Sequence, residues 1–144
     1  MYLISHRGNL NGTSNFENHP KTIDKAISLG FDVEIDVHLI GSEIYLGHDN
    51  PQYHINFSWI KNRKDSLWIH CKNLEAVEFF YNKKHLNYFF HSTDKCTITS
   101  KGFIWVYPGY QPVKNSIAVL PDKNNEPYLN CLGVCSDYIL KYKI

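Results

Sequence analysis

The first ninety residues alternate between short apolar runs and helical patterns. Residues 2–6 are mostly apolar and precede a polar loop, which predicts a short buried strand. Residues 31–40 alternate between apolar and polar side chains as far as Leu39, so they predict a second strand with one apolar and one polar face. Gly41-Ser42 follows this strand and predicts a two-residue hairpin turn into residues 43–48.

Two helices are predicted in the same part of the chain. The first has Asn18 as a candidate N-cap, Pro20 in its first turn and Gly30 as its stop. The second begins after Asn73 and ends near His85. Strands interleaved with helices imply a largely parallel sheet. Further strands are expected over residues 67–72, 88–91, 103–107, 117–120 and 133–139, and the last three lack convincing helices between them.

Composition narrows the class of protein. A chain of 144 residues with 43% hydrophobic and 20% charged residues is typical of one globular domain, residues 1–144. The net charge of +1 gives no broad field for nucleic acid or an anionic membrane. No signal peptide or apolar span is recognisable, so a cytoplasmic protein without stable membrane insertion is expected. Its cysteines are then expected as reduced thiols, with zinc at Cys131 and Cys135 as the alternative.

The polar face of the second strand carries the clearest chemical signal. Glu34 and Asp36 stand two positions apart, so their carboxylates project from the same side of the sheet. On an antiparallel strand open to water, this face would simply be hydrated. Inside a parallel barrel, the same carboxylates would need a cation or a metal ion beside them.

Motifs around this strand resemble the N-terminal signature of the glycerophosphodiester phosphodiesterase family, within the phospholipase C-like phosphodiesterase barrels. The resemblance is dense over residues 4–49 and continues weakly through residues 67–72 and 136–138. The motifs are, in order, His6-Arg7-Gly8, Glu17-Asn18, Asp32-Val33-Glu34-Ile35-Asp36-Val37 and Leu46-Gly47-His48-Asp49.

The resemblance implies an α/β fold, a shortened TIM-like (β/α) barrel with seven or eight mostly parallel strands. Eight units in 144 residues would have 144/8 = 18 residues each. A strand, a full helix and two loops need more than that. Several outer helices are therefore expected to be missing.

The resemblance also assigns roles to nine side chains. They are acid and base catalysis by His6 and His48, phosphate binding by Arg7 and Lys72, metal binding by Glu34, Asp36 and His70, and support of the site by Glu17 and Asn18. Imidazoles suit proton transfer near neutral pH, and a divalent ion (Mg, Mn or Ca) polarises a phosphoryl oxygen. His70 stands where the family has a third acidic ligand, which favours metals that accept nitrogen.

Each of these residues also has an ordinary structural interpretation. His6 could be a strand-end histidine, His48 a surface residue at a hairpin end, and Glu17 a residue that holds its loop. Their joint spacing instead favours a metal-dependent phosphodiesterase acting on a glycerophosphodiester or a similar alcohol-linked phosphodiester, a small molecule or headgroup. Two alternatives remain open: a lyase that forms a cyclic phosphate at the same site, and a non-catalytic phosphate- or glycan-binding module.

Overall fold

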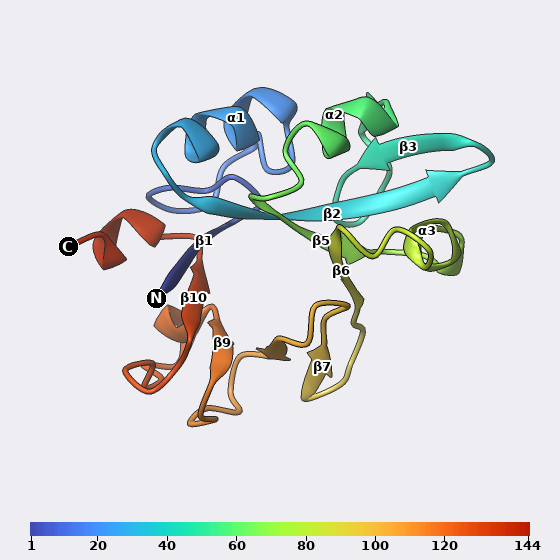
Figure 1. Cartoon of the computed structure of the whole chain (residues 1–144). Coiled ribbons are helices and arrows are strands. Elements are labelled where there is room, and N and C mark those ends of the chain that lie inside the picture. The colour runs from blue at the N-terminus through green and yellow to red at the C-terminus, as the bar shows by residue number, and fades with distance from the viewer.

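Ten strands form one curled sheet, and three α-helices lie along its outer side (Figure 1). The computed structural model describes residues 1–144. The strands are β1 (Tyr2–His6), β2 (Asp32–Ile40), β3 (Glu43–Leu46), β4 (Tyr53–Ile55), β5 (Leu67–Cys71), β6 (Asn87–Phe90), β7 (Cys96–Ile98), β8 (Ile104–Val106), β9 (Ser116–Val119) and β10 (Gly133–Ser136). The α-helices are α1 (Pro20–Ser28), α2 (Phe57–Lys61) and α3 (Leu74–Phe80), and short 3₁₀ helices cover Pro121–Lys123 and Ile139–Tyr142. None of the helices has the length and apolar character needed to cross a membrane.

The sheet is mixed. Its parallel part has the order β6-β5-β2-β1-β10-β9-β8, whereas β3, β4 and β7 are antiparallel to their neighbours. Gly41-Ser42 makes the predicted two-residue turn, because Ile40 pairs with Glu43 across it. After β7, the Ser100 N–H donates to the Tyr88 carbonyl at 2.8 Å, so this margin of the curl contacts β6.

The predicted shortened TIM-like (β/α) barrel is wrong. The sheet is a curled half-barrel of mixed strands, and no α-helix follows a strand after residue 80. The physical reason lies in the connections of the second half. Residues 99–103, 107–115 and 120–132 join β7 to β10 with no α-helix and only one 3₁₀ turn. Alternating β/α units therefore cannot form there.

Apolar residues pack on both sides of the sheet. On the outer side, Val33 and Ile35 of β2 pack with helix residues such as Ile23 and Phe80. On the inner side, a second cluster contains Ile4, Trp68, Phe89, Trp105, Ile117, Val119, Leu120 and Cys135. This inner cluster fills one end of the curl, so it forms an apolar floor beneath the strand ends.

Smaller differences from the sequence prediction concern helix ends and short strands. Asn18 does not cap α1; the N-cap is His19, whose Nδ1 accepts the Lys21 N–H at 3.1 Å. Asn73 caps α3 as predicted, but that helix ends at Phe80. The three-residue strands β4 and β7 were not predicted, because three residues are too few to show an alternating pattern.

Gly133 provides a test of the strand packing. It pairs with Tyr2 of β1 and Ile117 of β9. A Cβ added there would lie 2.6 Å from the Tyr2 Cβ and 2.8 Å from the Tyr2 carbonyl oxygen. We expect Gly133→Ala to lower the free energy of unfolding by about 2 kcal/mol through overpacking, measured by urea denaturation. Gly30→Asn is the control, because that position is open and its positive φ suits asparagine. Equal stability of Gly133→Ala and the unaltered protein would contradict this packing.

Candidate functional site

Neighbouring parallel strands carry polar residues on the inner side of the curl. His6 at the end of β1 pairs in register with Glu34 of β2, and Asp36 pairs with His70 of β5. Side chains alternate across a strand, so these four project away from the apolar residues that pack on the helices. The polar face of β2 is therefore buried inside the curl, with Glu34 2% exposed and Asp36 fully buried.

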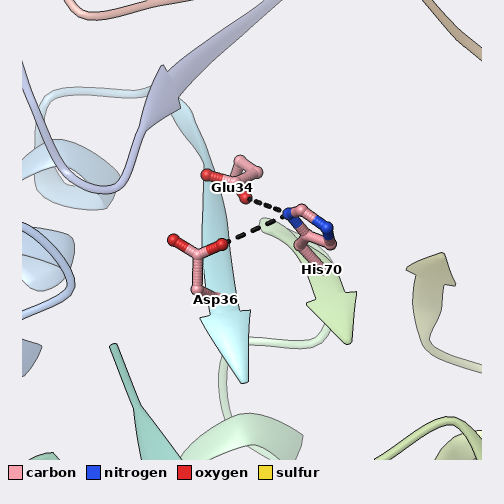
Figure 2. A group of neighbouring side chains, drawn as sticks. All are labelled: Glu34, Asp36 and His70. Atoms are coloured by element: carbon pink, nitrogen blue, oxygen red, sulfur yellow. Dashed lines mark ion pairs between the residues drawn. The ribbon is translucent and has the colours of Figure 1, made fainter. Parts of the chain in front are cut away.

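His70 lies between the two carboxylates of β2. Its Nδ1 is 3.4 Å from Glu34 Oε1 and 3.2 Å from Asp36 Oδ1 (Figure 2). Burial lowers the pKa of His70, but the hydrogen bonds and charges of both carboxylates outweigh burial and raise the pKa to about 9. Burial raises the pKa of Asp36, yet the hydrogen bond from His70 and the charge of Arg7 hold that pKa well below its usual range. His70 and Asp36 thus each favour the charged form of the other.

The same three side chains have ligand atoms that suit a divalent metal ion. One ligand atom from each of Glu34, Asp36 and His70 lies within 4.8 Å of the others. Glu34 Oε2 is buried and accepts no hydrogen bond, and the buried Asp36 Oδ1 contacts only His70 Nδ1 and Lys72 Nζ, so both oxygens keep a lone pair for a ligand. Two carboxylates and one imidazole suit Mn or Zn as well as Mg. These residues fit such an ion once His70 loses its proton, because only a neutral imidazole can coordinate.

Asn18 fixes the orientation of Asp36. Its Oδ1 accepts the Asp36 N–H at 2.9 Å, and its Nδ2 donates to Asp36 Oδ2 at 2.8 Å. Its own N–H donates to the Arg7 carbonyl, and its backbone has a φ of 62° in the left-handed region. Because its side chain faces β2, Asn18 is not available to cap α1.

Arg7 crosses the mouth of the site. Its Nε lies 2.9 Å from Asp36 Oδ2 and its Nη1 lies 3.3 Å from Glu17 Oε2. Burial lowers the pKa of Arg7, but the charges of Glu34, Asp36 and Glu17 outweigh burial and raise it. Lys72 Nζ approaches the other oxygen of Asp36 at 3.8 Å. Two fixed cations therefore stand beside the buried carboxylates.

Asp137 holds His6, a contact that the sequence analysis did not assign. His6 Nδ1 and Asp137 Oδ1 are 2.6 Å apart, and Asn9 Nδ2 donates to the same oxygen at 2.8 Å. Burial raises the pKa of Asp137, but the hydrogen bond and charge of His6 outweigh burial and lower it. The available signal was the position of Asp137, directly after the buried run of β10.

His48 follows the β2–β3 hairpin and is oriented in a similar way. Its Nδ1 lies 2.7 Å from Asp49 Oδ1, and its side chain is 40% exposed. Gly47 before it has a φ of 150°, and a Cβ there would lie 2.0 Å from the Asn50 oxygen, so only glycine fits. His38 Nε2 lies 2.9 Å from the Gly47 carbonyl oxygen and anchors this turn. His38 is not among the nine predicted site residues.

A cavity of about 610 Å³ lies at the ends of these strands. Seven of the nine predicted site residues line it, namely His6, Arg7, Glu17, Glu34, His48, His70 and Lys72. Asp36 lies beneath it, and Asn18 lines an adjoining polar cavity of about 230 Å³. The far wall of the larger cavity is mostly aromatic and apolar, with Trp105, Tyr107, Pro108, Val119 and Leu120. Cys131 and Cys135 take no part in the Glu34–Asp36–His70 cluster.

The aromatic wall also contains His91, which lies just beyond β6. The His91 carbonyl oxygen lies 3.1 Å from His70 Nε2, and the two imidazole rings are 6.0 Å apart. Burial, followed by the positive charge of His70, lowers the pKa of His91. His70 therefore contacts the two carboxylates through Nδ1 and a backbone carbonyl through Nε2.

Comparisons of the chain with protein-family models, with curated proteins and with solved structures gave no match.

The contact between His6 and Asp137 predicts a pH-dependent contribution to stability. The pKa of Asp137 is lower in the folded than in the unfolded protein, so its stabilisation is complete above the unfolded value of about 3.9 and decreases as the pH falls through the folded value. We expect Asp137→Asn to be less stable by about 1 to 2 kcal/mol at pH 6, with a gap that narrows below pH 4. Urea unfolding at each pH measures this gap.

Asp49→Asn is the matched control, because Asp49 also pairs with a histidine but its side chain is 85% exposed. Its effect should be small at every pH. A gap for Asp137→Asn that is the same at pH 6 and below pH 4 would contradict the assigned contact.

Proposed function

We propose that this protein cleaves a glycerophosphodiester or a similar alcohol-linked phosphodiester with the help of a divalent metal ion. The observation that carries the proposal is a pair of imidazoles, His6 and His48, in the wall of one cavity. In each, Nδ1 contacts a carboxylate, and Nε2 makes no hydrogen bond within the protein, although His6 Nε2 lies 3.9 Å from Glu34 Oε2. The resemblance of the surrounding motifs to the glycerophosphodiester phosphodiesterase family supports the same activity.

Cleavage of a phosphodiester needs two proton transfers. One imidazole accepts the proton of the attacking oxygen, and the other donates a proton to the leaving alcohol oxygen. Asp137 and Asp49 orient the two rings and stabilise the imidazolium form of whichever ring holds the proton. Water as the attacking group gives hydrolysis, with a phosphate monoester and an alcohol as products.

Arg7 and Lys72 are the proposed phosphate contacts. Arg7 uses Nε and Nη1 on Asp36 and Glu17, which leaves its Nη2 to face an anion. Lys72 adds a second positive charge in the same cavity wall. Because Asp36 and Glu17 already hold the guanidinium group, Arg7 loses little side-chain freedom when phosphate binds.

Glu34, Asp36 and His70 would hold the metal ion, as their free lone pairs permit. When bound, such an ion polarises the phosphoryl oxygen and balances the charge that develops on it. Asn18 keeps Asp36 Oδ1 turned toward His70 by binding the opposite oxygen. The carboxylates are thus oriented by the protein before any ligand arrives.

Backbone strain at the cavity is consistent with a functional site. Arg7, Asn18 and Leu120 have φ values of 56°, 62° and 47°, in the left-handed region that non-glycine residues rarely occupy. Each costs on the order of 1 kcal/mol and persists where surrounding contacts hold it. All three line the larger cavity or the polar cavity beside it.

Turnover of bis(p-nitrophenyl) phosphate tests the acid and base roles. We expect His6→Ala and His48→Ala each to lower kcat by at least about 100-fold, because each removes one positioned proton-transfer group. Their effects should not multiply in the double variant, since the two groups act on one reaction. His54→Ala is the control, because His54 pairs with Glu43 on the exposed β3–β4 hairpin, away from the cavity.

Several outcomes would contradict this assignment. Full activity in either variant removes that histidine from the mechanism. Phosphate binding without turnover in the unaltered protein contradicts cleavage and indicates a binding module. Phosphorus NMR of a glycerophosphodiester reaction identifies the product. A cyclic phosphate would show that the same site catalyses cyclisation instead of hydrolysis.

Metal binding provides a separate test. We expect His70→Glu to raise the affinity for Ca or Mg relative to Mn, because it exchanges an imidazole for the oxygen ligand that hard ions prefer. His70→Ala should weaken the binding of all three, while His54→Ala should leave them unchanged. Isothermal titration of each protein measures these affinities, and unchanged affinity in His70→Ala would show that His70 is not a ligand.

A further inference from the structure

We infer that one alcohol of the substrate carries an anionic group of its own, and that Lys123 in the far wall of the cavity binds this group. The inference rests on the proposed function, because it concerns the substrate of the same site. It makes the substrate a phosphodiester with a second negative charge, a carboxylate or a further phosphate, on the alcohol that extends toward the far wall.

Lys123 is a cation of the cavity that the protein does not pair. It lines the same cavity as Arg7 and Lys72, and its side chain is exposed, so a ligand can reach it. Arg7 and Lys72 both contact Asp36, whereas Lys123 forms no ion pair in the structure. Its ammonium group is therefore available to an anion from outside the chain.

The two carboxylates nearest to Lys123 in the sequence are bound elsewhere. Asp122 accepts the Ser136 hydroxyl at 2.5 Å through Oδ2, and its Oδ1 lies 3.3 Å from Lys141 Nζ. Glu126 Oε1 accepts two backbone N–H groups of the loop after β8, at 2.8 and 3.0 Å. The chain thus has an acid on each side of Lys123 and pairs neither of them with it.

The 3₁₀ turn that ends in Lys123 is fixed at the cavity. Leu120 before it has the strained φ of 47°, and its N–H donates to the Cys135 carbonyl at 2.7 Å. Pro121 is buried, and its carbonyl accepts the Glu126 N–H at 3.0 Å. Strained backbone held in this way is concentrated at active sites and ligand clamps. The turn therefore keeps the lysine in the cavity wall instead of on a free loop.

The strand order separates Lys123 from the proposed phosphate contacts. Arg7 follows β1 and Lys72 follows β5, the two strands that flank β2, whereas Lys123 follows β9, with β10 between β9 and β1. A ligand whose phosphate lies at Arg7 and Lys72 must extend past His6 to reach Lys123. An anionic group there gains a charge-assisted hydrogen bond that a neutral alcohol cannot make as strongly.

Two phosphate monoesters with the same four-carbon chain test the inference without requiring turnover. One is 4-(phosphonooxy)butanoate, which ends in a carboxylate, and the other is 4-hydroxybutyl phosphate, which ends in a hydroxyl group. We expect the unaltered protein, titrated calorimetrically in magnesium buffer at low salt, to bind the carboxylate ligand about fivefold more tightly, as one exposed ion pair allows. Lys123→Gln should abolish this preference, and Lys123→Arg, which keeps the charge, should retain it.

Lys101→Gln is the matched control, because it removes the same charge from an exposed turn that does not line the cavity, and its preference should equal that of the unaltered protein. Equal binding of 4-hydroxybutyl phosphate by all the variants would show that they are folded.

Three outcomes would overturn the inference alone. They are equal affinity of the unaltered protein for the two ligands, an unchanged preference in Lys123→Gln, and an equal loss of affinity for both ligands in that variant, which would assign the lysine to the shared phosphate. Failure of both ligands to bind the unaltered protein would contradict the proposed function and the inference together.

Discussion

Two carboxylates buried two residues apart on one strand are the constraint from which the rest of the site follows. Glu34 and Asp36 face the inside of the curl, where water cannot solvate them, so positive charge must come from the protein or from a bound ion. The structure surrounds them with Arg7, His70 and Lys72. Each cation comes from β1 or β5, the strands next to β2, or from the loop after one of them. Neutralising the two carboxylates therefore favours the pairing of β1 and β5 with β2.

The apolar floor under these groups strengthens their interactions. Trp105, in the cavity wall, packs against Trp68 and Phe89, with ring centroids 5.8 Å and 4.7 Å away. Charges close to such a layer are screened less than charges in water. Burial alone would lower the pKa of His70 and raise the pKa of Asp36, but the hydrogen bonds and charges of their neighbours outweigh burial and shift both in the opposite direction.

Local patterns in the sequence predicted the parts of the structure that depend on local physics. The apolar run of β1, the alternation of β2, the Gly41-Ser42 turn and the cap of α3 all depend on neighbouring residues. The overall architecture depends on the connections in the second half of the chain. These loops have no helical pattern, and their sequences do not show whether the sheet closes into a barrel or remains a half-barrel. Asp137 and His91 could not be assigned either, because their contacts join residues far apart in the chain.

The position of β1 in the sheet links the order of synthesis to the assembly of the site. β1 lies between β2, which follows it closely, and β10, whose residues come more than a hundred positions later. A nascent chain can therefore bring Glu34, Asp36 and His70 together early, while His6 still lacks its carboxylate partner. Only when β10 docks does Asp137 reach His6, so completion of the sheet and orientation of this imidazole are one event.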